Sequence, residues 1–217
     1  MAKISVIGAN GTIGRRVLDE ALARGHEVTA VVRRPSTLER EPAGNLTVTT
    51  GDVLDPEGVA SLVAGQDVVV SAVGGGDGAG HERLIEPSLR VLVDSLRAAG
   101  PGAARLIAVG GAGSLTTTPG KKVWDFPGLP DDALRTMRAH GEGLRFLRSV
   151  TDVRWTSLSP AIIIAPGTRT GRYRTGADDV LMDSAGRSHI SAEDYALALV
   201  DEIERPRHVG RRFTVAY

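Results

Sequence analysis

The sequence predicts an α/β fold in which helices cover both faces of a parallel sheet. Short apolar runs alternate with segments of helical period along most of the 217 residues. One run, residues 67–73, is apolar almost throughout, as is typical of a parallel strand buried on both faces. A glycine-rich turn joins the first run to the first helical segment. We therefore expect a doubly wound sheet in a single domain.

The glycine turn follows the first predicted strand, residues 4–7, and precedes a helix predicted over residues 12–24. Gly8, Gly11 and Gly14 have the spacing G-x-x-G-x-x-G. Gly8 permits a sharp turn, Gly11 leaves room for a diphosphate, and Gly14 lets the helix approach the strand. The free N–H groups and the dipole of the helix start would hold the phosphates. This is the dinucleotide-binding context of a Rossmann-type fold; a glycine turn without a ligand is the alternative.

The next two predicted strands, residues 27–32 and 46–50, lead to the expected adenosine site. Arg33 and Arg34 follow the first of them, where arginine accommodates the 2′-phosphate of NADP and a carboxylate would select NAD. We therefore expect NADP(H) to be preferred over NAD(H); two solvated arginines are the alternative. After the second strand, Asp52 could accept a hydrogen bond from the adenine amino group and Val53 could pack on the ring. Asp52 could equally be a turn or cap residue.

The remaining elements follow from periodicity and caps. Asp55 is the expected cap of a short helix that has Pro56 in its first turn. Helices are predicted over residues 81–99, 131–149 and 191–204, and strands over residues 105–110, 154–158 and 211–216. Residues 162–165 continue as an apolar segment, and residues 188–190 read as a short strand. The arginine- and glycine-rich residues 167–183 suggest a hairpin or a lid over the active face.

Ligands of such sheets bind beyond the carboxyl ends of the strands, and this rule selects the candidate residues. Ser114 follows the strand at 105–110 and could orient an acceptor or the nicotinamide amide. His140 could assist protonation from the helix at 131–149, or be structural. Trp124 and Phe126 could wall the nicotinamide pocket or be packed in the core. The residues expected to contact the cofactor are Gly8, Asn10, Gly11, Thr12, Ile13, Arg33, Arg34, Asp52, Val53, Ala72, Val73 and Gly74.

These motifs resemble those of the atypical short-chain dehydrogenases/reductases. The resemblance rests on residues 8–14, 71–74 and 157–160 together with Asp52, and it extends over nearly the whole chain. Residues 109–115, 155–161, 166–171 and 190–196 look closer to the branch named for NADH-flavin reductases, which is similar to biliverdin reductase B and the NmrA-like proteins. The resemblance implies a Rossmann fold with a small carboxyl-terminal substrate lobe, here residues 160–190. The branch name suggests NADH, whereas Arg33 and Arg34 favour NADP.

The usual proton-transfer pair of this superfamily, Tyr-x-x-x-Lys, does not occur in the sequence. The tyrosines are Tyr173, Tyr195 and Tyr217, and no lysine follows any of them at that spacing. Reduction of FMN, FAD or a similar planar acceptor is possible without this pair, because the acceptor ring can take its proton from solvent. We therefore expect an NAD(P)H-dependent reductase. A non-catalytic NADP(H) sensor resembling NmrA is the second hypothesis, and a nucleotide-sugar epimerase is the third.

Composition excludes several other classes of protein. Lys plus Arg equals Asp plus Glu at 26 each, so nothing indicates a nucleic-acid or polybasic membrane surface. The absence of cysteine excludes disulfides and thiolate chemistry, and the five histidines have no metal-ligand spacing. With no signal peptide or membrane-spanning run in the sequence, we expect a cytoplasmic monomer or homodimer that acts on a small-molecule acceptor.

Overall fold

The computed structural model describes residues 1–34, 44–117 and 120–217, and its centre is a mostly parallel sheet. The strand order is β3-β2-β1-β4-β5-β6-β10-β8, in which only the β10–β8 pair is antiparallel. A second, two-stranded parallel sheet pairs β7 with β9. The strands are β1 (Lys3–Ile7), β2 (Glu27–Val32), β3 (Leu46–Thr50), β4 (Val68–Ser71), β5 (Arg105–Val109), β6 (Trp155–Ser159), β7 (Ile163–Ala165), β8 (Arg174–Gly176), β9 (His189–Ser191) and β10 (Arg211–Ala216).

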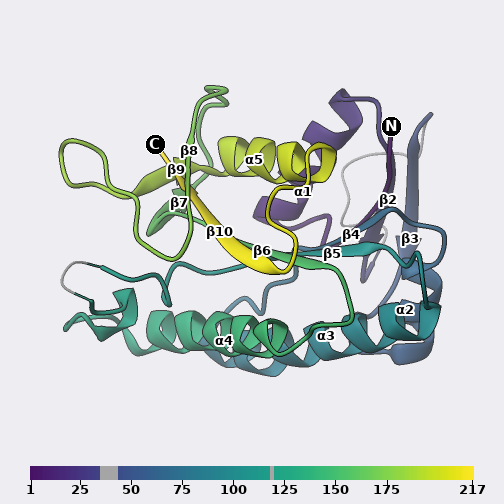
Figure 1. The fold of residues 1–217 in the computed structure, drawn as a ribbon, viewed down its shortest axis with the longest axis horizontal. Helices are drawn as coiled ribbons and strands as arrows, with labels where there is room; N and C mark the ends of the chain where they lie inside the picture. The colour runs from purple at the N-terminus through teal and green to yellow at the C-terminus, as the bar shows by residue number, and fades with distance from the viewer. Residues whose placement is uncertain (35–43, 118–119) are drawn as a thin grey trace.

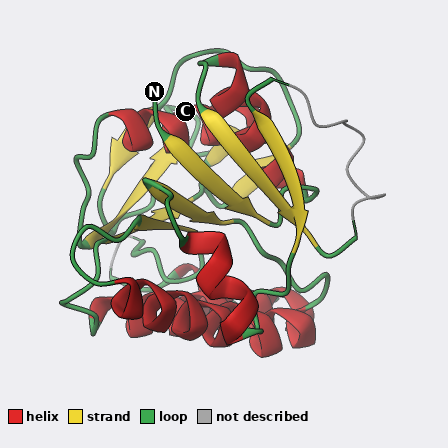
Figure 2. Ribbon diagram, turned by 90° about the vertical axis from the view of Figure 1, so that its right-hand side faces the viewer, coloured by secondary structure: helices red, strands yellow, loops and turns green. Residues whose placement is uncertain are grey.

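Helices cover both faces of the large sheet, as Figures 1 and 2 show. Ile4 and Val6 of β1 are in the hydrophobic cluster that includes residues of α1 and α5, whereas Ile7 is in the cluster with α2, α3 and α4. Successive residues of a buried strand thus serve opposite cores. The helices are α1 (Thr12–Ala23), α2 (Pro56–Val63), α3 (Gly78–Ala99), α4 (Asp131–Arg148) and α5 (Ala192–Glu204), with a 3₁₀ turn η2 (Val123–Asp125). The Rossmann-type architecture predicted from the sequence is confirmed.

The start of α3 differs from the prediction, which began this helix at residue 81. The helix begins at Gly78 because the Asp77 carboxylate caps it, accepting from the Gly80 N–H at 2.6 Å. The Asp132 carboxylate accepts from the Gly78 N–H at 2.7 Å, tying this end of α3 to α4. The first turn contains two glycines, and their low helix propensity explains why the sequence did not predict a helix there.

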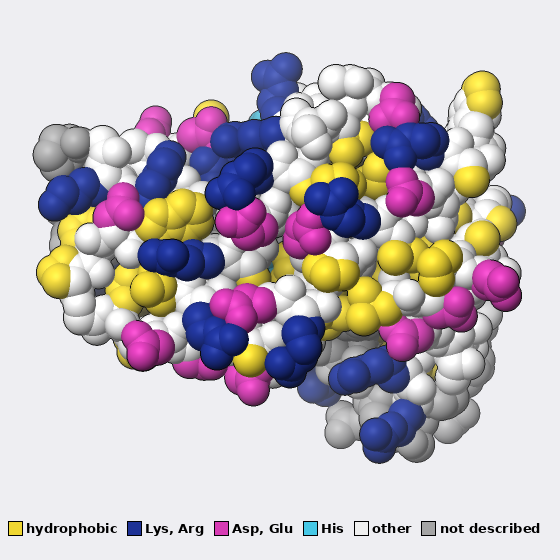
Figure 3. Space-filling model, turned by 90° about the horizontal axis from the view of Figure 1, so that it is seen from below, with side chains coloured by type: hydrophobic (Ala, Val, Ile, Leu, Met, Phe, Trp, Pro, Cys, Tyr) yellow, Lys and Arg dark blue, Asp and Glu magenta, His cyan; other side chains and the backbone are white. Residues whose placement is uncertain are grey.

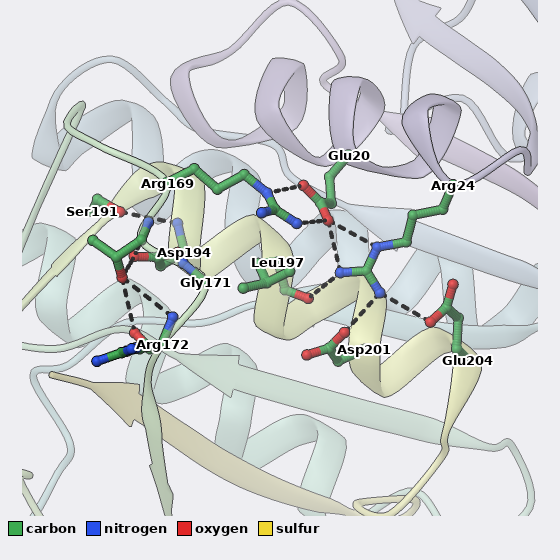
Figure 4. A network of polar contacts seen from close by, with 11 residues as sticks. Glu20, Arg24, Arg169, Gly171, Arg172, Ser191, Asp194, Leu197, Asp201 and Glu204 are labelled. Carbon is green, nitrogen blue, oxygen red and sulfur yellow. Dashed lines mark hydrogen bonds and ion pairs between the residues drawn. The ribbon is translucent and has the colours of Figure 1, made fainter.

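The arginine- and glycine-rich segment at 167–183, for which the sequence suggests a hairpin or a lid, is packed on α1 and α5 and on the sheet edge. β8 pairs with the edge of β10. Arg169 donates to both carboxylate oxygens of Glu20 at 2.8 and 2.9 Å, and Arg24, the residue that follows α1, binds the same carboxylate (Figure 4). Ion pairs between residues far apart in the chain therefore determine the position of this segment, which its local sequence does not predict.

Asp194 on α5 is the polar centre of this region and is fully buried. Its carboxylate accepts from the N–H and hydroxyl of Thr170, the Gly171 N–H and the Tyr217 hydroxyl. Burial alone would raise the pKa of Asp194, but these hydrogen bonds together lower it below its usual value. The folded state therefore favours the ionised carboxylate, and this stabilisation is lost as the pH falls through the lowered pKa.

We expect Asp194→Asn to lower the free energy of unfolding by about 1–3 kcal/mol, because an amide cannot replace a carboxylate that accepts several hydrogen bonds. The melting temperature of the wild type should also fall more steeply below pH ~4 than that of the variant. Calorimetry across pH measures both effects. Asp94→Asn is the control, since the Asp94 side chain is 70% exposed; equal losses in the two variants would contradict this role of Asp194.

The outer surface of α2, α3 and α4 carries charges of both signs. In the view from below, Lys and Arg side chains alternate with Asp and Glu over this face (Figure 3). In the described part of the chain, no helix has the length and apolar character needed to cross a membrane.

Candidate functional site

A cavity of about 750 Å³ lies at the carboxyl ends of the central strands. It is lined from the loops after β1 to β6, which is where open α/β sheets bind ligands. One continuous space therefore connects the predicted diphosphate, adenosine and acceptor regions. The predicted residues that line it are Gly8, Asn10, Gly11, Thr12, Ile13, Arg33, Asp52, Val53, Ala72, Val73, Gly74 and His140.

The glycine turn has the geometry of a phosphate cradle. Gly8 has a φ of 84°, and a Cβ there would lie 2.6 Å from the Ala72 carbonyl oxygen. A Cβ on Gly14 would lie 2.1 Å from the Gly8 oxygen, so both positions require glycine for packing. Gly11 is different: it has ordinary extended torsion angles, and the nearest heavy atom to a Cβ would be 3.2 Å away. Gly11 borders the cavity, where the absence of a side chain would let a ligand approach the backbone.

The N-terminus of α1 opens on this cradle without a competing group. No side chain caps the helix, and its first turn holds no acidic residue. Gly11, Thr12 and Ile13 line the cavity there. The N–H groups of a first helical turn lack intrahelical partners, so this end of α1 suits an anion. The residues present therefore fit the diphosphate of a nicotinamide dinucleotide.

Arg33 and Asp52 occupy the opposite end of the cavity, beyond β2 and β3. Arg33 is exposed and lines the cavity, whereas Arg34 is exposed but is not among the lining residues. Asp52 borders the cavity, and one of its carboxylate oxygens accepts a hydrogen bond from the Leu54 N–H at 2.9 Å. Asp52 is therefore a turn residue that also faces the space expected to hold a ligand. Val53 is buried beside them.

The region beyond β4 and β5 contains residues that sequence reasoning missed. His81 and Leu84 of α3 line it opposite Thr136 and Met137 of α4. His81 Nδ1 lies 2.7 Å from the Asp77 carbonyl oxygen, so Nδ1 is the donor. Its Nε2 lies 3.6 Å from where a Cβ on Gly74 would be. The sequence could have indicated His81 as a candidate, because it lies in the first turn of the helix that follows β4 and its glycine-rich loop.

His140 faces His81 across this region. The ring centroids are 5.6 Å apart and the rings are tilted by 50°. Burial, aided by the neighbouring His81, lowers the pKa of His140 to about 4. The ring is therefore neutral near pH 7, where it can donate a hydrogen bond but holds no imidazolium proton for transfer. His140 lines the cavity as expected, and its assistance in protonation stays a prediction.

Ser114 lies outside the set of described residues that line the cavity. Its hydroxyl accepts from Arg212 Nη1 at 2.7 Å, and Arg212 also pairs with Asp178. Strand β10 thus engages the hydroxyl that was expected to orient the acceptor. Trp124 is packed on α4, where a Cβ on Gly141 would meet its ring at 2.6 Å, and Phe126 is 47% exposed. Neither aromatic residue is among the described residues that line the cavity, so the alternative of packing inside the protein fits Trp124, and neither alternative fits the exposed Phe126.

The tyrosine hydroxyls are all engaged in structural hydrogen bonds. Tyr195 lines the cavity, yet its hydroxyl donates to the Leu158 carbonyl at 2.7 Å, and burial raises its pKa. Burial and the Asp201 carboxylate raise the pKa of Tyr173. Tyr217 donates to Asp194. No tyrosine is thus prepared to transfer a proton to a ligand in the cavity.

Two comparisons relate the chain to known protein sequences. The model of a family described as NAD(P)H-binding matches residues 8–206. The uncharacterized protein YwnB of Bacillus subtilis (strain 168) is 40% identical over 216 residues, which are 98% of this chain and 97% of YwnB.

Two solved structures are similar over the full chain but have different names. A Streptococcus pneumoniae TIGR4 protein, provisionally named an NADH-flavin reductase, is 31% identical with a TM-score of 0.88, covering 100% of this chain and 99% of that one. A Bacteroides thetaiotaomicron protein, provisionally named an epimerase, is 41% identical with a TM-score of 0.89, covering 100% and 97%. The names differ in reaction, so the residues of this cavity must discriminate between them.

Proposed function

The chain belongs to the NAD(P)H-binding family, and from this premise we propose that it is an NADPH-dependent reductase of a flavin or another planar acceptor. The observation that carries the proposal is the single cavity, which joins the glycine turn and Arg33 to a region with apolar walls beyond β4 and β5. Bound NADPH supplies a hydride. The protein has to hold the acceptor against the nicotinamide and keep water from between them.

The cavity supports reduction better than epimerisation. An epimerase of this superfamily needs a positioned acid or base to move a proton on carbon. Here the hydroxyl of Tyr195, the tyrosine that lines the cavity, donates a hydrogen bond to the Leu158 carbonyl oxygen. None of the described residues that line the cavity is a lysine. The lowered pKa of His140 makes this ring a weak base. Hydride transfer to a planar ring does not require such a group.

Arg33 supports NADPH as the reductant. It is the cationic side chain at the adenosine end among the described residues that line the cavity. A guanidinium binds a 2′-phosphate through charge-assisted hydrogen bonds, whereas an NAD-specific site carries a carboxylate after this strand.

Addition of NADPH and FMN to the protein tests the proposal. We expect NADPH absorbance to fall at a rate that depends on protein concentration and saturates with acceptor, because the protein aligns the two rings. A rate equal to that of the free reagents, for FMN and for uncharged acceptors, would contradict it. Tight NADPH binding with that result would instead support a cofactor sensor, the function favoured by the missing Tyr-x-x-x-Lys pair.

A further inference from the structure

The acceptor end of the cavity has apolar walls and no charged side chain among the described residues that line it. The charged lining residues, Arg33 and Asp52, follow β2 and β3. Strand β5 lies three strands from β2, about 14 Å at the usual inter-strand spacing. The walls at the acceptor end are formed by Leu84, Ala112, Met137, Pro160, Ile162 and Ile164.

Two charged side chains next to this region neutralise each other at the surface. Glu82 follows His81 and Arg135 precedes Thr136, and these two side chains form an ion pair at 2.5 Å between α3 and α4. Both are exposed, so water also screens them. An anionic group on the acceptor would therefore find no unpaired cation in the described lining of this end.

The polar side chains that line this end are two histidines and a threonine. His81 and His140 contribute ring nitrogens from α3 and α4, and Thr136 adds a hydroxyl. The Nδ1–H of His81 already donates to the Asp77 carbonyl oxygen and leaves Nε2 as an acceptor, so the side-chain donors that remain are the N–H of neutral His140 and the hydroxyl of Thr136. Such a pair matches a carbonyl oxygen on a ring better than it matches a carboxylate or phosphate, which needs several donors or a cation.

We infer that the acceptor is an uncharged planar ring that carries a carbonyl oxygen, such as a quinone or an isoalloxazine without a phosphate. This inference rests on the proposed reductase function and narrows its substrate class. In the reaction, the acceptor gains a hydride from NADPH and a proton from water, which end on N5 and N1 of an isoalloxazine or on the two oxygens of a quinone. NADPH is oxidised to NADP⁺ as the acceptor is reduced to its dihydro form.

Riboflavin and FMN test the inference, because they share one ring system and differ by a phosphate. With wild-type protein and saturating NADPH, we expect kcat/KM for riboflavin to exceed that for FMN by roughly fivefold or more, since burying an unpaired charge is costly. The pair 1,4-naphthoquinone and its 2-sulfonate should show the same order. A higher kcat/KM for FMN and the sulfonate would overturn the inference and leave the reductase function intact. Failure of all four acceptors would overturn both.

The substitution Ile162→Arg tests the mechanism of this selectivity. Ile162 is 39% exposed and lines the cavity, so arginine can be accommodated with its cation near the acceptor. We expect kcat/KM for FMN to rise about tenfold relative to riboflavin, because opposite charges attract strongly in a partly desolvated site. Ile163→Arg is the matched control: Ile163 is 60% exposed and is not a lining residue. Equal effects of both variants would show that bulk charge, not the cavity, governs the preference, and would overturn the inference.

Discussion

Replacement of Gly11 by valine is expected to weaken NADPH binding by at least ~100-fold while leaving the protein folded. Gly11 precedes α1 with φ −72° and ψ 167°, an extended conformation that valine adopts readily. Its Cβ would lie 3.2 Å from the Gly8 oxygen, a contact relieved by a small shift. The branched side chain would then occupy the space in which the diphosphate has to approach the backbone. Loss of several charge-assisted hydrogen bonds accounts for the size of the effect.

Titration of NADPH fluorescence measures this change, and a thermal melt measures the fold. Gly14→Ala is the contrasting variant, because its Cβ would lie 2.1 Å from the Gly8 backbone oxygen and neither backbone segment can yield easily. It should lower the melting temperature substantially, whereas Gly11→Val should not. Unchanged NADPH affinity in Gly11→Val would mean that the dinucleotide does not lie in the glycine turn.

Replacement of Arg33 by aspartate should reverse the cofactor preference. We expect the wild type to bind NADPH more tightly than NADH, and the variant to lose about 10- to 100-fold in NADPH affinity. The new carboxylate repels the 2′-phosphate and can accept hydrogen bonds from the ribose hydroxyls of NADH. Since Arg33 is exposed and follows β2, the fold should tolerate the change.

Arg34→Asp makes the same change in net charge one residue further along. Arg34 is also exposed but does not line the cavity, so its replacement should alter the NADPH to NADH ratio much less. Equal NADPH and NADH affinities in the wild type would remove the argument for NADP. Equal effects of the two substitutions would show that general charge, and not contact with Arg33, sets the preference.

The elements governed by local pattern could be predicted from the sequence. Strands β2, β3 and β10 have the predicted limits, and α2 has its Asp55 cap, with the carboxylate accepting from the Glu57 N–H. The glycine turn was also recognisable, because its three glycines serve a strand, a ligand space and a helix at fixed spacing. These features depend on residues close together in the chain.

The features that sequence reasoning missed depend on long-range contacts. Ser114 binds Arg212, which lies 98 positions away, and no local pattern indicates that pairing. The segment at 167–183 is held by Arg169 on Glu20, 149 positions away. His81 is a candidate ligand-binding residue because the packing of α4 against α3 places His140 opposite it. Tertiary packing therefore decided which of several plausible polar residues border the cavity.

A crystal structure after soaking in excess NADPH tests the central claim most directly. We expect density for the diphosphate beside Gly11 at the N-terminus of α1, with the 2′-phosphate at Arg33 and the nicotinamide toward His81 and His140. Solvent alone beside Gly11, or a dinucleotide bound elsewhere, would contradict the account of this cavity and the reductase function built on it.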